Sequence, residues 1–358
     1  MRNKIIFIRS TAIGSLIDGS PKVGGIAVQL YFWAKAFSAA GWKVYTMGGR
    51  TSYKKEGITF IKYKNWGALD IIHEWLHTFW VYLRYRPDLV IERGAGRSLF
   101  PVARLAKLFH IKMVLFGASD VNFEPGKELI SGSERNRRLF QKGIRSVGFF
   151  VVQNQHQQDT LKENYHRDSL ILPNIWGQVA TRAVVQATDV VWVANLRTLK
   201  RPEWMMYAAK ALSQFRFTMV GGADAKEVAY YKKIEQEAKN IENMSFLGGR
   251  PFMETCSIIS QAKVLVCTST FEGFPNTFLQ AWSYGIPVVS TVDPSSIIVS
   301  NKLGMVITSE KELSEALSNM LEDKKLYEQL CENVKAFFAK NYSSDNALQR
   351  LLDYCKVV

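Results

Sequence analysis

A carboxylate, a flexible glycine and a helix start follow one another in the segment Phe271–Asn276. The apolar run Val264–Cys267 before it is typical of a buried parallel strand, and a helix is predicted from about Asn276 to Tyr284. Open α/β sheets bind ligands at the carboxyl ends of their strands. The free amides of a helix start favour phosphate, whereas Glu272 would repel phosphate and suits hydroxyl groups. The segment therefore predicts a ligand that carries both phosphate and hydroxyl groups, which describes a sugar nucleotide.

A spaced set of residues continues from this loop: Glu272, Gln280, Ala281, Gly285, Pro287 and Val288. The set resembles the retaining glycosyltransferases of family four, the glycosyl transferases group 1 of polysaccharide biosynthesis. Their mark is a Glu, seven residues and a second Glu, followed by a small residue and Gly-x-Pro-Val; here Gln280 replaces the second Glu. The resemblance implies that Glu272 contacts the donor sugar, that the backbone after it holds the diphosphate, and that position 280 holds the ribose hydroxyls. An amide oxygen still accepts a hydrogen bond from a hydroxyl, but without charge it holds ribose more weakly. The donor-binding residues predicted along this segment are Gly273, Phe274, Pro275, Asn276, Thr277 and Gln280.

A second loop with cations follows the apolar strand predicted at Val190–Ala194. Its residue Lys200 stands just before a helix that starts near Pro202, where a helix start and a cation can share a phosphate. In the family that this chain resembles, an Arg and a Lys five residues later clamp the diphosphate. Lys200 fits the Lys, Asn195 occupies the Arg position, and Arg197 is close enough to substitute for the Arg.

A third loop of the second half follows the predicted strand Met244–Leu247 and contains Arg250. Because the loop lies at the carboxyl end of a strand, Arg250 is a candidate contact for the nucleobase or a phosphate. A solvent-facing Arg explains the residue equally well.

Two loops of the first half could serve the same ligand. Gly24 and Gly25 follow the predicted strand Lys4–Ile8 and a loop rich in Gly, Ser and Pro, and they open a helix. A glycine pair suits a tight turn or a close approach to phosphate, and the resemblance favours the second. Asp120 lies in the polar loop after the predicted strand Lys112–Phe116; it is a candidate to receive an acceptor hydroxyl, or a cap or turn residue. No histidine base can be assigned in this loop.

The segment His73–His77 is a literal match to the zincin signature, with two histidines one helical turn apart and Glu74 between them. A zinc protease needs a third protein ligand, and the candidate Glu92 sits in a predicted apolar strand instead of on a following helix. Matches of five residues arise by chance, so we treat the zinc protease as a remote alternative. With no Asp-x-Asp motif in the chain, we expect neither a metal nor another cofactor.

Length and composition favour a globular protein of two domains, because 358 residues with 47% hydrophobic content exceed what one core usually serves. No apolar run approaches the about 20 residues of a membrane span, and the first residues run into a strand without a signal-peptide core, so we expect a cytoplasmic protein. The four cysteines show no close pairing, which favours buried reduced thiols over disulfides or zinc.

The net charge of +14 is uneven: residues 1–172 hold 26 Lys and Arg against 13 Asp and Glu, and residues 173–358 hold 20 against 19. A basic half can face nucleic acid, anionic lipid or an acidic substrate, or can simply be a solvated surface. In the first half, cations and interfacial aromatics mix in a way that is typical of a surface resting on an anionic membrane, although the tryptophans fit a core equally well. This predicted membrane surface consists of Lys54, Lys55, Lys62, Lys64, Trp66, Arg84 and Arg86. We expect no nucleic-acid partner.

Alternating strands and helices, with the resemblance, predict an α/β protein of the GT-B fold, in which two Rossmann-like domains face each other across a cleft. The expected parts are an acceptor domain at 1–172, a linker at 173–188, a nucleotide-sugar domain at 189–340 and a final helix at 341–358 that packs back on the first domain.

The predicted activity is retaining, metal-independent transfer of a sugar from a nucleoside diphosphate sugar to a glycan acceptor in surface polysaccharide assembly. The acceptor is expected to be linked to polyprenyl diphosphate, and the enzyme to lie peripherally on the inner face of the plasma membrane. Glu272, Lys200 and Asp120 are the predicted catalytic residues. A sugar-nucleotide epimerase of the same architecture and a sugar-nucleotide binding protein without turnover remain alternatives.

Overall fold

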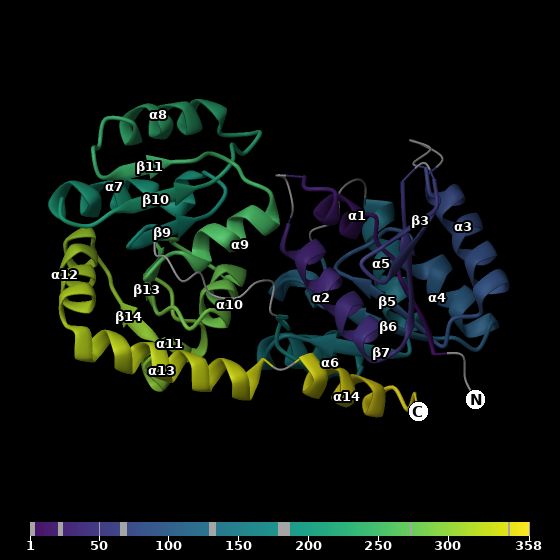
Figure 1. Cartoon of the computed structure of the whole chain (residues 1–358). Helices are drawn as coiled ribbons and strands as arrows, with labels where there is room; N and C mark the ends of the chain where they lie inside the picture. The colour runs from purple at the N-terminus through teal and green to yellow at the C-terminus, as the bar shows by residue number, and fades with distance from the viewer. Residues whose placement is uncertain are drawn as a thin grey trace. The chain divides into compact units, whose positions relative to one another are not determined.

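The computed structural model describes residues 4–20, 24–49, 51–64, 70–128, 134–177, 187–272, 274–342 and 344–357. They group into two compact units, each a sheet covered by helices (Figure 1). The amino-terminal unit contains the described residues of 1–18, 24–177 and 342–358, and the carboxy-terminal unit contains those of 19–23 and 178–341. The prediction of two α/β domains built on parallel sheets is confirmed.

Eight strands of the described amino-terminal unit form one sheet in the order β3-β4-β2-β1-β5-β6-β7-β8. All neighbours run parallel except β3, which pairs antiparallel with β4. The strands form because short runs of Val, Ile, Leu and Phe are buried on both faces, as in Ile5–Ile8. Their bounds are β1 (Ile5–Ile8), β2 (Lys43–Met47), β3 (Tyr53–Lys55), β4 (Ile58–Ile61), β5 (Leu89–Arg93), β6 (Lys112–Phe116), β7 (Phe149–Val152) and β8 (Leu170–Ile171).

Helices cover both faces of this sheet (Figure 1). They are α1 (Ala12–Ile17), α2 (Gly25–Ala39), α3 (Asp70–Tyr85), α4 (Leu99–Leu108), the 3₁₀ helix η2 (Asp120–Phe123), α5 (Glu134–Ser146), α6 (Gln155–Tyr165) and α14 (Ser344–Tyr354). The loop predicted between the first strand and Gly24 instead contains α1. Its apolar side chains Ile13 and Leu16, three residues apart, are both buried and give the segment a helical period that its small polar neighbours conceal.

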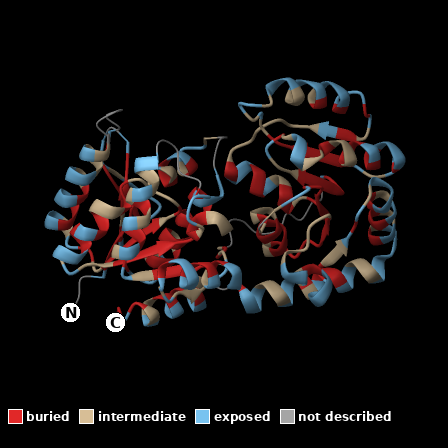
Figure 2. Cartoon of the chain, turned by 180° about the vertical axis from the view of Figure 1, so that it is seen from behind, coloured by how far each residue is buried: buried red, intermediate tan, exposed pale blue. Residues whose placement is uncertain are grey.

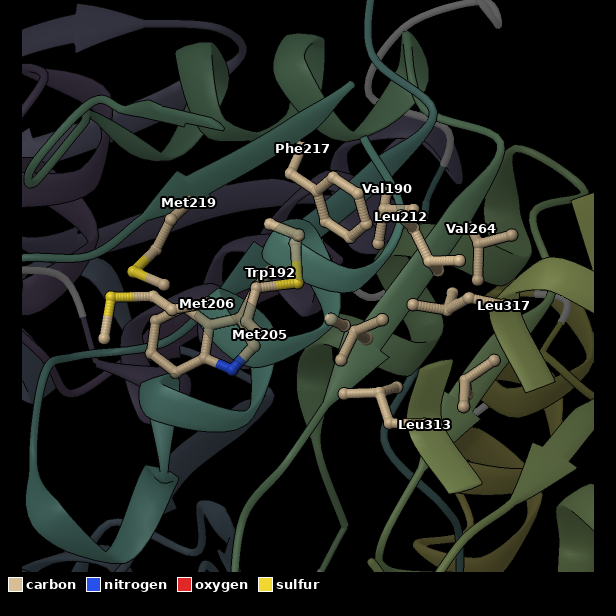
Figure 3. Close-up of a cluster of buried hydrophobic side chains, with 14 of the residues drawn as sticks. Val190, Trp192, Met205, Met206, Leu212, Phe217, Met219, Val264, Leu313 and Leu317 are labelled. Carbon is tan, nitrogen blue, oxygen red and sulfur yellow. The ribbon is translucent and has the colours of Figure 1, made fainter. Parts of the chain in front are cut away.

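Six strands of the described carboxy-terminal unit form an all-parallel sheet in the order β11-β10-β9-β12-β13-β14. Trp192 of β9 lies in the core of this unit with Met205 and Phe217 (Figure 3). The strands are β9 (Val190–Val193), β10 (Phe217–Val220), β11 (Met244–Phe246), β12 (Val264–Cys267), β13 (Val288–Ser290) and β14 (Gly304–Val306). The helices are η3 (Thr198–Lys200), α7 (Pro202–Ala211), α8 (Val228–Ala238), α9 (Phe252–Ser260), α10 (Asn276–Ser283), η4 (Pro294–Ser296), α11 (Ile297–Asn301), α12 (Glu310–Glu322) and α13 (Lys324–Asn341).

Strand order reverses once in each unit. In the carboxy-terminal unit β9 lies between β10 and β12, and in the amino-terminal unit β1 lies between β2 and β5. Where consecutive connections leave in opposite directions, the loops at the carboxyl ends of the two central strands diverge and leave a crevice that accepts ligands. The topology therefore points to the loops after β9 and β12, and to those after β1 and β5.

The chain leaves the amino-terminal unit through a segment that packs on α2. The Ile175 amide donates a hydrogen bond to Gln29 Oε1 at 3.0 Å, and the Trp176 ring lies 4.4 Å from that of Phe32. Residues 178–186 of the expected linker lie outside the described residues. Near the end of the chain, α14 packs against α2. Burial is highest in the strands and on the inner faces of the helices (Figure 2), and all four cysteines are free and buried, as predicted.

Candidate functional site

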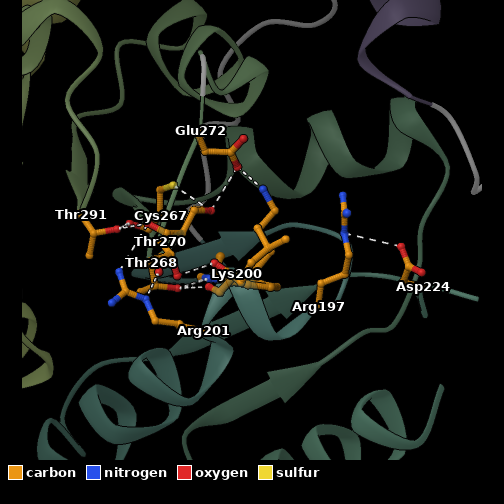
Figure 4. Close-up of polar contacts among 12 residues, drawn as sticks. Arg197, Lys200, Arg201, Asp224, Cys267, Thr268, Thr270, Glu272 and Thr291 are labelled. Carbon is orange, nitrogen blue, oxygen red and sulfur yellow. Dashed lines mark hydrogen bonds and ion pairs between the residues drawn. The ribbon is translucent and has the colours of Figure 1, made fainter. Parts of the chain in front are cut away.

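Lys200 and Glu272 meet at the reversal point of the carboxy-terminal sheet. Lys200 ends η3 in the loop after β9, and Glu272 lies in the loop after β12. The Lys200 ammonium donates to Glu272 Oε1, and the hydroxyl of Ser269 donates to the same oxygen at 3.1 Å (Figure 4). The two side chains are 12% and 25% exposed, so solute can reach both. A cation and a carboxylate thus stand side by side where the topology predicts a ligand.

Hydrogen bonds to backbone carbonyl groups hold these two loops together. The Thr268 hydroxyl donates to the Lys200 carbonyl at 2.6 Å, and the Thr270 amide donates to the Leu199 carbonyl at 2.8 Å. Arg201 Nε donates to the Thr268 carbonyl at 2.7 Å. These bonds tie the chain beside Lys200 to the chain before Glu272, so the two loops that carry the charged groups are held next to each other.

Arg201 reaches the β12 loop from an unusual conformation. Its φ of 47° is left-handed, and its guanidinium lies 4.0 Å from the centre of the Trp204 ring. A left-handed non-glycine residue costs free energy that surrounding contacts must offset. None of Arg201, Thr268 and Ser269 was predicted from the sequence. For Thr268 and Ser269, the available signal was a polar pair directly after a buried strand, where ligands bind.

Arg197 and Asn195 lie in the same loop as Lys200. Arg197 Nε is 3.5 Å from Asp224 Oδ2 in the loop after β10, so it points away from Glu272 while Lys200 points toward it (Figure 4). Asn195 is exposed. The loop therefore carries two cations, and each pairs with a different carboxylate: Arg197 with Asp224, and Lys200 with Glu272.

The start of α10 is built from apolar contacts. Pro275 is buried at the N-cap, and no side chain of the N-cap residue bonds the first amides. The Phe274 ring lies 6.3 Å from Phe278 and 6.2 Å from Trp282, which anchors the loop to the helix. Asn276 and Thr277 are partly exposed in the first turn, and Gly273 lies outside the described residues.

Gln280 turns into the unit. Its side chain is buried, and Nε2 donates to the Cys256 sulfur of α9 at 3.7 Å. Burial raises the pKa of the Cys256 thiol to about 12, so the thiol stays protonated near neutrality. In this conformation Gln280 joins α10 to α9, and its contact with ribose stays a prediction.

Arg250 follows β11 and pairs with Glu254 one helical turn later, at 3.2 Å from Nε to Oε1. This is an exposed pair between residues i and i+4, which contributes little to stability. The guanidinium stays accessible at the sheet edge formed by β11.

The predicted residues of the amino-terminal unit lie at the carboxyl edge of its sheet. Gly24 is the N-cap of α2, and a Cβ placed on it would meet no atom within 4 Å, so packing inside the chain does not demand glycine there. Asp120 Oδ1 accepts hydrogen bonds from Asn154 Nδ2 at 3.0 Å and Gln157 Nε2 at 2.9 Å. Asp120 thus joins η2 to the start of α6.

The zincin match in α3 is used for packing. Glu74 and Glu92 both pair with buried Arg9, at 3.1 and 2.9 Å, and His77 Nε2 lies 3.1 Å from the Lys62 carbonyl. Across the part of the chain that the structure describes, no three His, Cys, Asp or Glu residues gather in a way that could hold a metal. This geometry contradicts the zinc-protease alternative, because the carboxylates that would act as base and third ligand neutralise an arginine.

Residues 187–323 match the family model of the Glycosyl transferases group 1. That match spans β9 to α12 and so includes both loops of the Lys200–Glu272 pair. At the level of sequence, the chain is 25% identical over 173 residues to the Vi polysaccharide biosynthesis protein VipC/TviE of Salmonella typhi. The match covers 47% of this chain and only 28% of that relative's length.

Solved structures resemble the whole chain. Sucrose-phosphate synthase from Thermosynechococcus elongatus has a TM-score of 0.74 at 15% identity, over 99% of both chains. Anabaena Alr3699/HepE, solved in complex with UDP and glucose, has a TM-score of 0.73 at 16% identity, over 99% of this chain and 100% of the other. WaaG, a glycosyltransferase involved in lipopolysaccharide biosynthesis, has a TM-score of 0.63 over 99% of this chain. Identities this low show the fold alone, which is the predicted GT-B fold.

Proposed function

We propose that this chain is a retaining glycosyltransferase that moves a sugar from a nucleoside diphosphate sugar to a glycan acceptor in surface polysaccharide assembly. The Lys200–Glu272 pair at the reversal point of a parallel sheet carries the proposal. The family match over 187–323 and the polysaccharide relative support it, as does a structural neighbour that binds UDP and glucose.

A nucleoside diphosphate sugar would separate Lys200 from Glu272, and each of the two side chains would then bind a different part of the ligand. The ammonium of Lys200 would bind the diphosphate, and Glu272 would accept hydrogen bonds from sugar hydroxyls. Negative charge grows on the diphosphate as the glycosidic bond breaks, so Lys200, Arg197 and the first amides of α10 would stabilise the leaving group more strongly in the transition state than in the ground state. This electrostatic assistance requires no metal, and we expect full activity in the presence of EDTA.

The proposal is tested first by donor binding and hydrolysis. Thermal shift with UDP, GDP and their glucose and mannose conjugates identifies the nucleotide, because a ligand that binds only the folded chain raises its stability by mass action. The preferred donor is then incubated with the chain, and released sugar and nucleotide are measured. Lys200→Ala should strongly reduce the rise in Tm at a given nucleotide concentration, while the exposed Lys210→Ala on α7 should behave like the wild type.

Each alternative predicts a different result in these assays. A sugar-nucleotide binding protein would show the thermal shift without hydrolysis or transfer. An epimerase would convert the intact sugar nucleotide to its epimer, which chromatography separates. If none of the nucleotides or sugar nucleotides raises the Tm, the proposed function itself is contradicted.

The apolar face of α3 supports a membrane-borne acceptor. Six large apolar side chains of this helix are between 37% and 56% exposed: Ile72, Trp75, Leu76, Phe79, Trp80 and Leu83. Figure 2 shows this helix at the edge of the amino-terminal unit with most of its outer surface exposed. A contiguous exposed stripe on a helix indicates an interaction surface. Within the described parts of the chain, no helix is long and apolar enough to cross a bilayer.

The cations of the predicted membrane surface are exposed wherever they are described, and Trp66 lies outside the described residues. Lysines and arginines beside exposed tryptophans suit the interface of an anionic bilayer. The proposed enzyme therefore lies peripherally on the cytoplasmic face of the plasma membrane, where a polyprenyl diphosphate-linked glycan would be its acceptor.

Cosedimentation with vesicles tests the membrane part separately. Binding to vesicles with phosphatidylglycerol should exceed binding to pure phosphatidylcholine and should weaken as salt rises. The double variant Ile72→Ser/Leu76→Ser should reduce binding, whereas Val299→Ser, at an exposed site of the carboxy-terminal unit, should not. Equal binding to both vesicle types would reject the anionic surface and favour a soluble acceptor.

A further inference from the structure

Arg93 ends β5 at the carboxyl edge of the amino-terminal sheet, beside the reversal point between β1 and β5. Neighbouring strand residues point to opposite faces, and Glu92 points to Arg9. Arg93 therefore points to the other face. Its register partner Phe116 packs against Trp33 of α2, with ring centres 5.2 Å apart, so the Arg93 side chain lies on the α2 face.

No carboxylate lies within ion-pair distance of Arg93 among the described residues. One guanidinium nitrogen donates to Asn174 Oδ1 at 2.7 Å, and this oxygen also accepts from Gln153 Nε2 at 2.9 Å. The Nε of Arg93 is buried without a hydrogen-bond partner. Burial lowers the pKa of Arg93 to about 10, and no neighbouring charge opposes this shift.

Arg9 provides the contrast within the same sheet. It is buried at the end of β1, one strand away from Arg93, and pairs with Glu92 and Glu74. A buried guanidinium without such partners lowers stability, because it loses hydration and gains no opposite charge. Arg93 is in this situation, and the residue as a whole is only partly buried.

We propose that Arg93 is an oxyanion-binding residue of the amino-terminal unit, and that the anion it receives is a phosphate or carboxylate group of the acceptor. The planar guanidinium still has donors free of protein partners, which suit the paired oxygens of such a group. The assignment of the anion to the acceptor rests on the proposed function and on the excess of cations in residues 1–172, 26 against 13 acidic residues. The binding of an oxyanion as such does not rest on it.

Phosphate binding is measured in a Lys200→Ala background, so that the carboxy-terminal site does not contribute. The full chain is titrated with inorganic phosphate, or with acetate as a carboxylate, against chloride of equal ionic strength, and thermal unfolding is recorded. We expect phosphate, acetate or both to raise the Tm of the background chain. Arg93→Gln, which keeps a donor for Asn174, should lose this rise, Arg93→Lys should keep part of it, and the exposed Arg104→Gln on α4 should keep all of it.

The Tm measured in chloride, without phosphate or acetate, distinguishes a ligand-binding role of Arg93 from a structural role. If Arg93 serves a ligand, Arg93→Gln should be at least as stable as its background, because it removes a charge that lacks a partner. The proposal is overturned if, for each anion, the rise in Tm is the same in the background chain and in Arg93→Gln. The absence of any rise in both chains also overturns it. If Arg93→Gln does not fold, the same comparison is made with Arg93→Lys.

The source of the anion is decided by UDP binding in the otherwise wild-type chain. If the acceptor supplies it, Arg93→Gln should leave the Kd for UDP within about twofold, whereas Lys200→Ala should raise it by roughly tenfold to a hundredfold. A similar loss in both variants would assign the anion to the donor diphosphate and overturn the acceptor assignment. Neither measurement requires catalytic turnover, so failure here is distinct from failure of the proposed glycosyltransferase activity.

Discussion

Lys200 and Glu272 form an ion pair across two loops that leave neighbouring strands of one sheet, and Ser269 donates to the same carboxylate oxygen. Each charged group is therefore compensated when no ligand is bound. A donor that carries both a diphosphate and hydroxyls would exchange one protein contact for two ligand contacts. Under the proposed function, the ammonium would meet the diphosphate of a sugar nucleotide and the carboxylate would meet its sugar hydroxyls.

Lys200→Ala should weaken nucleoside diphosphate binding by roughly tenfold to a hundredfold, the range for a lost hydrogen bond to a charged group. It should also lower turnover, because charge on the diphosphate increases as the bond breaks. Isothermal titration and initial rates measure the two effects. Kinetics equal to those of the control Lys210→Ala would reassign Lys200 to a structural role.

Glu272→Ala should remove transfer while the fold stays intact, since a loop carboxylate that is 25% exposed contributes more to function than to stability. The expected loss of unfolding free energy is about 1–2 kcal/mol, because Lys200 loses its partner but keeps some contact with water. Glu242→Ala, at an exposed position of the same unit, is the matched control. A stability loss as large as that of a core substitution would argue against this role.

Gln280→Glu tests whether position 280 reaches ribose. Without ligand, a carboxylate beside Cys256 should lower Tm, because a buried charge lacks a partner there. A ribose hydroxyl would supply that partner, so the variant should bind nucleoside diphosphate more tightly and show a larger ligand-induced rise in Tm. Weaker nucleotide binding would mean that ribose lies elsewhere.

Arg9→Met should destabilise the amino-terminal unit by about 3–5 kcal/mol, because it leaves Glu92 buried without a cation. Although burial alone would lower the pKa of Arg9, the charges of Glu92 and Glu74 raise it above its ordinary value. Chemical denaturation measures the loss. Arg9→Met/Glu92→Met should recover part of it, and a double variant no more stable than the single one would contradict this account.

His77 should make the chain sensitive to mild acid. Burial lowers its pKa from 6.5 to about 4, and the charges of His73 and Arg9 act in the same direction. The unfolded chain therefore binds more protons between these values, so this contribution to stability is complete above about pH 6.5 and is lost as pH falls toward 4. His77→Gln should lose less stability than the wild type between pH 7 and pH 5. Parallel pH profiles would show that other groups cause the acid response.

Much of the fold was predictable because buried parallel strands have a clear local signature. The run Val264–Cys267 and the helix from Asn276 appear in the structure as β12 and α10. Short elements were missed where the local signal is weak. The strand β3 contains Lys54 and Lys55, which are exposed, and it forms only by pairing with β4. Such a strand depends on its partner more than on its own residues.

Side-chain partners were harder to predict than elements. Glu272 and Lys200 were each assigned to a ligand from their own loops, but nothing local indicated that they would contact each other. The resemblance implies that position 280 faces ribose, which stays a prediction, but nothing local indicated that the Gln280 amide would donate to Cys256. A side chain on a helix is directed by what packs against that face, which a linear spacing does not contain.

The sequence by itself determined the alternation of strands and helices and the positions of the loops that could hold a ligand. It did so because hydrophobic period and helix boundaries are local properties of the chain. Only the tertiary structure decided which strands are neighbours, and therefore that Lys200 meets Glu272, that Glu74 and Glu92 share Arg9, and that Arg93 has no carboxylate beside it among the described residues. Charges interact over a few ångströms in space regardless of their separation along the chain, so their pairing is a property of the folded molecule.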